Sequence, residues 1–417
     1  MEKKKASVSW LAPIALGAMM FSTYVGPGYA AGTQTVNYFL TKGSVGVLTG
    51  VLATGLLSLI FCLLMMEIYR IYQPKHYREA YNIVFDNKIL NFIICNLKDI
   101  ISVLMVIVSV AAQISGAATI LHNLFGLPMI IGQILFVAII LVLCLYGAKV
   151  INATGTLMTL AILGVTLYIA CAVLPQVWGK SMEFVHAGIQ PQEYGFSTFN
   201  AWYVMLGFCT MFCAGLTPAA STGRGVLVDR KTMIVACLTN IILCVASTMV
   251  YTLVFAGAMP EVASEAIPTL YVMQNASDTS RLAQILYAIL AIAAMISTGV
   301  SLMFSMAARF QGPLGKIWKN SSERARKVVV VVLFLLICTF GSSIGILKLV
   351  RYGFGTLTKL TLPVTFLPLL FFVPYRIWRD KKAGMFNKDG FYIKADLSAA
   401  YPDGVPEYAT VGVKEEN

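Results

Sequence analysis

Two apolar stretches of this sequence contain helix-breaking residues beside polar side chains, a combination that frees backbone groups for binding ions or small ligands. The first stretch, FSTYVGPGYAAGTQTVNYF, holds Gly26, Pro27 and Gly28 near its middle. Proline removes an amide donor, and glycine makes unwinding cheap. The second stretch, FNAWYVMLGFCTMFCAGLTPAAS, holds Gly207 and Pro218. We expect unwound segments in both, although ordinary kinks and packing glycines are the alternative.

A third stretch, AIAAMISTGVSLMFS, offers oxygen atoms at helical spacing. Ala294, Ser297 and Thr298 stand at i, i+3 and i+4, so one carbonyl and two hydroxyls share a helix face. A hard monovalent cation accepts such oxygens. The alternative is that small hydroxyl residues pack one helix against another.

Ionisable groups are absent from the middle of the apolar runs. Glu67 and Asp99 lie near the ends of their runs, where carboxylates stay hydrated, and the three histidines fall in connecting segments. Proton relays normally use buried Asp, Glu or His. The nine cysteines show no metal-binding spacing, and we predict no bound cofactor. Gln113, at the centre of its run, is a neutral amide that needs partners, and we predict a functional role for it.

The elements that must position these residues are membrane-spanning helices. Of the 417 residues, 58% are apolar and only 12% are charged, whereas soluble proteins are about 25% charged. The basic residues fall in short clusters and form no face for nucleic acid. A bilayer core about 30 Å thick needs roughly 20 apolar residues per helix. The predicted spans are 8–40, 44–70, 93–121, 128–147, 151–174, 198–222, 232–257, 281–309, 328–347 and 357–375.

The distribution of basic residues predicts the orientation. With ten spans, 25 of the 31 Lys and Arg residues fall on the side of both termini, and six on the other. Basic residues accumulate in cytoplasmic loops, so both termini are expected in the cytoplasm of a bacterial cell. The predicted regions are an N-terminus (1–7), two five-helix repeats (8–176 and 198–375) and a loosely ordered cytosolic tail (376–417).

Breaks in spans one and six of ten are what two inverted five-helix repeats produce. Half-helix ends then face a cavity at mid-membrane, where amino ends favour carboxylates and carbonyl ends favour cations. The predicted fold is therefore an all-α polytopic membrane protein of ten transmembrane helices, built as two inverted five-helix repeats with broken helices 1 and 6.

The stretch from Gly26 to Leu48, GPGYAAGTQTVNYFLTKGSVGVL, resembles the signature of the YkvI-type membrane proteins. These are similar to the amino acid–polyamine–organocation superfamily with the leucine-transporter fold. The resemblance implies sodium- or proton-coupled uptake of small solutes by alternating access. Two positions depart from the pattern. Gln34 stands where the family usually has glutamate, and Tyr29 stands where the second sodium site of this fold expects asparagine.

Carried over by position, the resemblance implies a substrate between the two unwound segments and a sodium ion beside span eight. The sodium ligands would be the carbonyls near Ser22 and Val25, the carbonyl of Ala294, and the hydroxyls of Ser297 and Thr298. The residues expected to bind substrate are Tyr24, Gly26, Gly28, Tyr29, Gln34, Gln113, Gly207, Phe208 and Phe212.

The function expected from these features is sodium-coupled import of a small solute, an amino acid or related zwitterion, with aromatic side chains forming a wall. A receptor that binds a ligand without transport, with the tail as its output, and a proton-coupled transporter are the alternatives. An intramembrane enzyme would need a buried acid or histidine, and a channel would need rings of carbonyls or charges; the sequence shows neither. The lipid bilayer and the solute are the expected partners, and the sequence does not determine the oligomeric state.

Overall fold

The computed structural model is helical almost throughout and describes residues 8–146, 162–276, 279–402 and 404–412. The predicted N-terminal segment 1–7 and the first part of the predicted span 151–174 lie outside these residues. Among the described residues the one β-bridge pairs Phe386 with Tyr392. The helices up to the chain centre are α1 (Leu11–Tyr24), α2 (Pro27–Ala30), α3 (Thr33–Tyr38), α4 (Thr49–Tyr72), α5 (Tyr77–Val84), α6 (Lys88–Phe125), α7 (Met129–Tyr146) and α9 (Leu174–His186). The later helices are α10 (Thr198–Gly207), α11 (Cys209–Phe212), α12 (Leu216–Thr222), α13 (Arg230–Ala256), α14 (Pro268–Asn275), α15 (Arg281–Ile317), α16 (Glu323–Ser342), α17 (Ile346–Lys348), α18 (Gly355–Thr361) and α19 (Leu367–Lys382).

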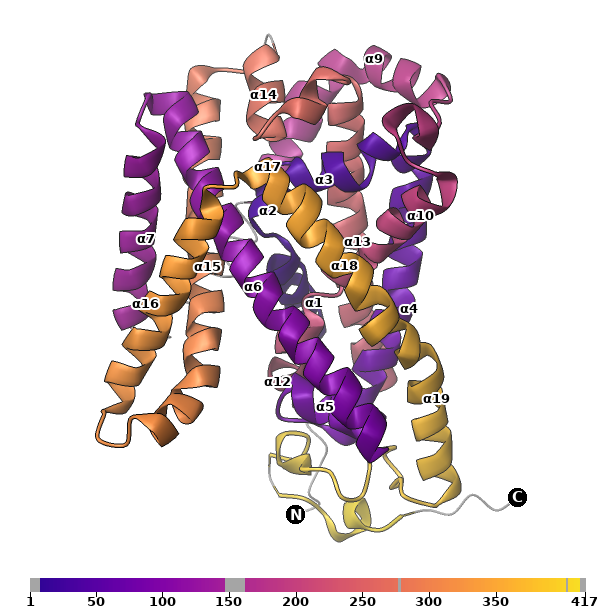
Figure 1. Cartoon of the computed structure of the whole chain (residues 1–417). Coiled ribbons are helices and arrows are strands. Elements are labelled where there is room, and N and C mark those ends of the chain that lie inside the picture. Colours follow the sequence, from indigo (N-terminus) through magenta and orange to yellow (C-terminus); the bar gives the residue numbers. More distant parts are fainter. Residues whose placement is uncertain (1–7, 147–161, 277–278, 403, 413–417) are drawn as a thin grey trace.

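Eight helical segments of the described chain are long and apolar enough to cross a bilayer, and two shorter apolar helices accompany them. The two shorter helices are Leu11–Tyr24 and Met129–Cys144. α1 has 14 residues and is therefore only about 21 Å long, so α2 and α3 must complete its crossing of a core about 30 Å thick. Both termini lie at the same end of the bundle (Figure 1), as an even number of spans requires.

The spans pack in two groups, and a span and the span five positions later in the chain often belong to the same group. α1 and α4 pack against α13, and α10 to α12 join them, which unites spans one, two, six and seven. α6 packs against α7, α15 and α16, which unites spans three, four, eight and nine (Figure 1). Each of the first four helices thus shares its group with its counterpart five helices later, the relation that an inverted repeat creates.

Local sequence signals set the start of several helices. A Ser or Asp side chain accepts a hydrogen bond from an amide of the first turn, which satisfies one of the four free donors there. These capping residues are Ser197 for α10, Asp229 for α13, Ser280 for α15 and Ser322 for α16.

Spans nine and ten begin earlier than predicted. Span nine is helical from Glu323 to Ser342, and span ten runs from Ile346 to Lys382, not from 357 to 375. The prediction excluded Lys348 and Arg351 as loop residues, yet both lie in the first turns of span ten. Long basic side chains at a helix end extend toward the polar boundary while their stems stay apolar, so they do not break the span.

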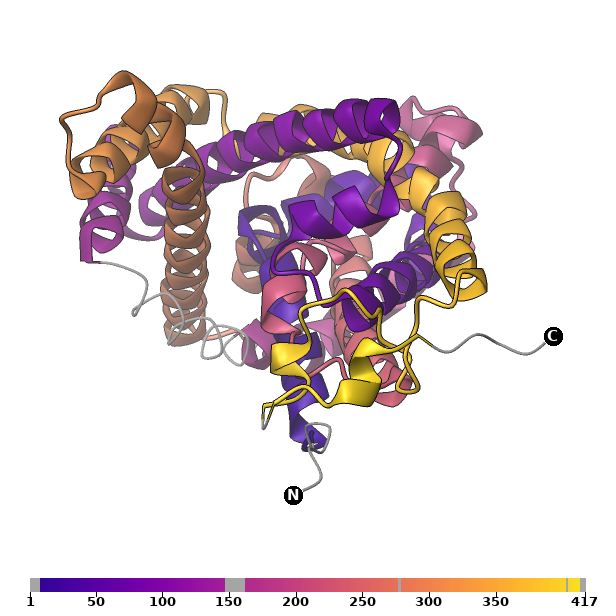
Figure 2. The same cartoon turned by 90° about the horizontal axis from the view of Figure 1, so that it is seen from below.

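The prediction of a loosely ordered tail is wrong for the described residues after α19. Phe391 and Tyr401 are buried there in a small apolar core with Val228 of the α12–α13 loop. The backbone amide of Tyr392 donates to the carbonyl of Ile71 at the end of α4, 2.9 Å away. Figure 2 shows the tail beneath the ends of α4 and α12, away from α7, α15 and α16. Sequence periodicity could not reveal this core because its apolar residues are irregularly spaced.

Candidate functional site

The break in span one follows from Pro27. α1 ends at Tyr24, and the amide of Gly26 turns back to the carbonyl of Tyr24, 2.8 Å away, instead of continuing the helix to Ser22. No backbone amide of the described chain donates to the carbonyl of Ser22 or Val25. The interruption therefore leaves two carbonyl oxygens at a half-helix end, where negative partial charge collects.

The break in span six lies directly against α1. α11 ends at Phe212 and α12 begins at Leu216. Gly215 packs so closely on α1 that a Cβ atom there would lie 2.4 Å from the Cα of Met20. Only glycine allows this crossing. The two interrupted spans thus meet at their breaks, as the matched positions in the sequence predict.

Aromatic side chains from the two breaks form one cluster. The ring of Tyr24 lies 4.9 Å from that of Tyr29, 5.9 Å from that of Phe208 and 5.1 Å from that of Phe212, measured between centroids. Most of these pairs are tilted or edge to face, the favoured geometries. Tyr29, Phe208 and Phe212 are fully buried, and Tyr24 is 4% exposed. The four residues proposed as a wall from the sequence are therefore neighbours in space.

Polar atoms line this aromatic cluster. The Tyr24 hydroxyl shares a hydrogen bond with that of Thr248 on α13, at 3.1 Å. The side chain of Gln34 packs against Gly28. A Cβ atom added to Gly28 would lie 2.6 Å from the Cγ atom of Gln34. Tyr29 Oη and Gln34 Oε1 are buried and have no hydrogen-bond partner among the described residues. Two buried polar atoms without partners beside a half-helix break are groups that a polar ligand could satisfy.

Hydrogen bonds close the end of the site remote from the termini. Tyr38 Oη lies 3.1 Å from Thr358 Oγ1, which ties α3 to α18. Arg351 Nε donates to Asn37 Oδ1 at 2.9 Å, and the amide of Thr269 in α14 donates to the carbonyl of Ala31 at 3.1 Å. The short helix α14 thus covers the second half of span one.

A buried lysine lies beside this closed end. Lys42 is 2% exposed, and its ammonium donates to the carbonyl of Asn37 at 2.8 Å and to Thr41 Oγ1 at 2.7 Å. It also lies 3.6 Å from the centroid of the Phe196 ring. Burial lowers the pKa of Lys42 from its usual 10.5 to about 7, and the nearby positive charge of Arg351 lowers this pKa in the same direction. The sequence offered no signal that this loop lysine is buried.

The predicted sodium ligands lie on α1 and α15. α15 contacts span one through Tyr287, whose hydroxyl donates to the carbonyl of Ala30 at 2.8 Å. Ala294 and Thr298 follow Tyr287 by 7 and 11 residues and therefore lie on that same face of α15. The Thr298 hydroxyl donates to the Ala294 carbonyl at 3.0 Å, and Ser297 lies about a quarter turn away. The structure therefore places Ala294 and Thr298 on the face of α15 that carries Tyr287, and the contact of α15 with the described part of span one is through α2.

Gln113 lies where α6 packs against α15. Its fully buried amide packs against Gly299 on α15. A Cβ atom added to Gly299 would lie 2.5 Å from Gln113 Oε1 and 2.8 Å from the Cδ1 atom of Ile140 on α7. Its Nε2 lies 3.4 Å from Ser109 Oγ, and its Oε1 has no described partner. The structure therefore places Gln113 among α6, α7 and α15, beside Gly299, the residue that follows the predicted sodium ligand Thr298.

Sequence reasoning missed the residues that α13, α14 and α15 contribute. The Tyr251 ring lies 5.1 Å from that of Tyr29, and Phe255 lies one turn further along α13. Thr248, Tyr251 and Phe255 stand at helical spacing in span seven, a stripe that could have been read as facing span one.

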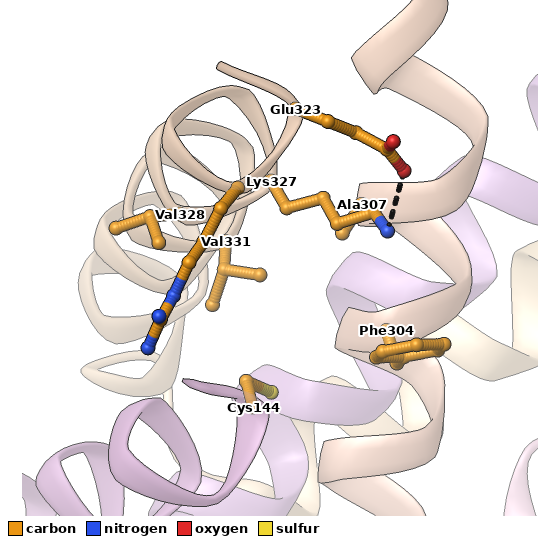
Figure 3. A pocket seen from close by; sticks show the side chains of 8 residues that line it. Cys144, Phe304, Ala307, Glu323, Lys327, Val328 and Val331 are labelled. Carbon is orange, nitrogen blue, oxygen red and sulfur yellow. Dashed lines mark ion pairs between the residues drawn. The ribbon is translucent and has the colours of Figure 1, made fainter. Parts of the chain in front are cut away.

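A pocket of about 430 Å³ lies elsewhere, between α7, α15 and α16. Figure 3 shows the ion pair of Glu323 and Lys327 beside Ala307 at one end, and Cys144 and Phe304 at the other. It includes none of the predicted substrate or sodium residues.

Comparison with known proteins identifies the fold. No protein-family model and no curated protein matches the sequence. The inward-facing conformation of Mhp1 superposes with a TM-score of 0.61 and 14% identity, over 97% of this chain and 83% of that one. The chain has the leucine-transporter fold. Mhp1 is described as a nucleobase-cation-symport-1 family transporter. Its closed conformation with bromovinylhydantoin bound superposes with a TM-score of 0.56 and 12% identity, over 95% of this chain and 86% of that one. MhsT in complex with L-phenylalanine superposes with a TM-score of 0.54 and 14% identity, over 90% of this chain and 98% of that one.

Within the leucine-transporter fold, the apolar spans make this chain a multi-pass membrane protein. The interruptions of its helices 1 and 6 lie where the two inverted repeats of the fold meet. At these low identities the likeness concerns the fold alone. Membership of the YkvI-type family stays a prediction, because no family model matches.

Proposed function

We propose that this protein is a secondary active transporter that imports a small solute, an amino acid or related zwitterion, by sodium-coupled alternating access. The observation that carries the proposal is the meeting of the two helix breaks around the aromatic cluster of Tyr24, Tyr29, Phe208 and Phe212. MhsT binds L-phenylalanine and Mhp1 is a transporter, which supports both the function and a substrate of this kind. The proposed setting is a bacterial inner membrane with both termini in the cytoplasm.

The chemistry of the site fits a zwitterion with an apolar side chain. Pro27 has no amide hydrogen, so the amides of Gly28 and Tyr29 are the first in α2 that would present partial positive charge to a carboxylate, and a four-residue half-helix supplies only part of a full helix dipole. The free carbonyls of the span-one break and Gln34 Oε1 would accept hydrogen bonds from an ammonium group. The rings would cover an apolar side chain.

Sodium would couple to solute through α15. A cation held between the span-one carbonyls and the Ala294–Thr298 oxygens joins the two helix groups described above, and its binding would favour the state in which they are closed on each other. The described middle of the bundle holds no acid, so neutral oxygens are the ligands available. A sodium ion is hard and accepts carbonyl and hydroxyl oxygens.

Thermal-shift screening of the purified protein with the twenty amino acids, with and without sodium, tests the binding part of the proposal. We expect one or a few amino acids to stabilise the protein, and more strongly in sodium. Thr298→Ala should abolish the sodium effect. Thr339→Ala is the matched control, because Thr339 makes the same hydroxyl-to-carbonyl bond, to Leu335, on the remote helix α16. Equal sodium dependence in Thr298→Ala would contradict the ion site.

A ligand-sensing receptor is the second candidate, favoured by the folded tail packed on α4 and the α12–α13 loop. A ligand that stabilises the protein but never accumulates in proteoliposomes would support the receptor and refute the transporter. Uptake that follows a proton gradient and ignores sodium would instead support the proton-coupled alternative.

A further inference from the structure

The pocket between α7, α15 and α16 has an apolar wall and a cationic rim. Phe304, Val328 and Val331 belong to the wall, with Ala307 and Cys144. The rim carries Arg324 and Lys327 from the first two turns of α16. The volume of about 430 Å³ falls in the range of about 300–1,000 Å³ typical of ligand pockets. A ligand for such a site has an anionic head and an apolar body.

The rim keeps a net positive charge. Lys327 pairs with Glu323 at 2.8 Å (Figure 3), whereas Arg324 makes no ion pair with a described residue. A cation in the first turn of a helix opposes its dipole, so the charge of Arg324 does not stabilise α16. Between residues 309 and 327 the chain has six basic residues and one acidic residue. This charge is complementary to phosphate.

The pocket lies where a lipid headgroup would be. α15 and α16 are spans eight and nine, and the loop that joins them is at the end of the bundle that carries both termini (Figure 1). In this loop Ile317 is 84% exposed and Trp318 is 45% exposed. Exposed tryptophan at a span end is typical of the boundary between hydrocarbon and water. A molecule in the pocket therefore contacts hydrocarbon on one side and the headgroup layer on the other.

From this geometry we propose that the α7–α15–α16 pocket binds an anionic phospholipid, with its phosphate on Arg324 and Lys327 and an acyl chain along Phe304, Val328 and Val331. Basic pockets between transmembrane helices are known to hold such headgroups. The bound lipid joins spans four, eight and nine, all in one of the two packed groups. It is independent of the solute site and of the nature of the solute.

Native mass spectrometry of the full chain with dioleoyl-phosphatidylglycerol and dioleoyl-phosphatidylcholine tests this proposal. We expect retention of phosphatidylglycerol and little of phosphatidylcholine. Because each cation contributes about 1 kcal/mol near an anionic headgroup, R324Q/K327Q should weaken phosphatidylglycerol binding about thirtyfold. The control K388Q/K394Q removes two exposed cations from the tail at the same end and should leave binding unchanged.

A second variant tests the apolar wall while keeping the charges. Val328→Phe fills the pocket and should also reduce phosphatidylglycerol retention, with an unchanged thermal unfolding midpoint in lipid-free detergent. Three results would each overturn the proposal. K388Q/K394Q could lose as much phosphatidylglycerol binding as R324Q/K327Q, the wild type could retain phosphatidylglycerol and phosphatidylcholine equally, or sn-glycerol 3-phosphate could displace the bound phosphatidylglycerol completely. The last result would assign the rim to a soluble phosphate.

Discussion

The crossing of the two broken spans makes Gly215 the most sensitive position of the proposed site. Replacing it by alanine would place a Cβ atom 2.4 Å from Met20 Cα and 2.6 Å from the Met20 carbonyl oxygen. Carbon atoms pack at about 3.5–4.0 Å, so α1 and the span-six break must separate by about 1 Å. The obstacle is backbone, which cannot rotate away as a side chain can. We expect Gly215→Ala to destabilise the fold by about 1–3 kcal/mol.

Thermal unfolding in detergent, read from intrinsic fluorescence, measures this effect. Gly164→Ala is the matched control, because Gly164 lies in a helix, Gly215 has helical backbone angles (φ −64°, ψ −14°), and a Cβ atom at Gly164 meets nothing within 4 Å. Alanine there should be neutral or stabilise by up to about 1 kcal/mol, the difference in helix propensity. The two variants should therefore differ in sign. An unchanged unfolding midpoint for Gly215→Ala, with ligand binding intact, would refute the close crossing of the two breaks.

Three further predictions concern other parts of the molecule. Tyr24→Phe leaves the buried hydroxyl of Thr248 on α13 without its partner and should lower the free energy of unfolding by about 1–3 kcal/mol. Tyr352 is 65% exposed, so the control Tyr352→Phe should leave this free energy unchanged. Equal thermal unfolding midpoints for the two variants would contradict the Tyr24–Thr248 hydrogen bond. Because burial lowers the pKa of Lys42 from 10.5 to about 7, the unfolded chain binds more protons between these pH values, and stability should rise with pH in that window. Lys42→Met should flatten this rise, and an identical pH profile would show that the lysine is hydrated. Phe391→Ala removes a fully buried ring of the tail core and should make the tail cleavable by trypsin, whereas Tyr408→Ala, at a side chain that is 44% exposed, should not. Equal cleavage of the two variants would contradict the folded tail.

The breaks and the spans could be predicted from sequence because their signals are local. Pro27 removes a hydrogen-bond donor wherever it stands in a helix, and a long apolar run needs lipid whatever its neighbours are. Tyr24 and Phe212 were assigned to one site by the resemblance to the leucine-transporter fold, and the matched breaks agree with that assignment.

Features that depend on contacts between distant segments were not predictable. Gln113 was expected to have a functional role because a buried amide needs partners, but its position against Gly299 of α15 depends on the rotation of α6, which no local signal fixes. Lys42 is buried by Phe196, more than 150 residues away. The tail core depends on Val228 in a loop of the bundle. Each of these contacts joins segments whose spacing carries no period.

Accumulation of radiolabelled amino acids in proteoliposomes tests the central claim most directly, with an inward sodium gradient imposed on wild type, Thr298→Ala and Thr339→Ala. The account predicts that wild type and Thr339→Ala concentrate at least one amino acid only while the gradient lasts, and that Thr298→Ala does not. Uptake in Thr298→Ala equal to wild type would contradict the sodium site, and the absence of gradient-driven uptake by any amino acid would contradict the proposed transport.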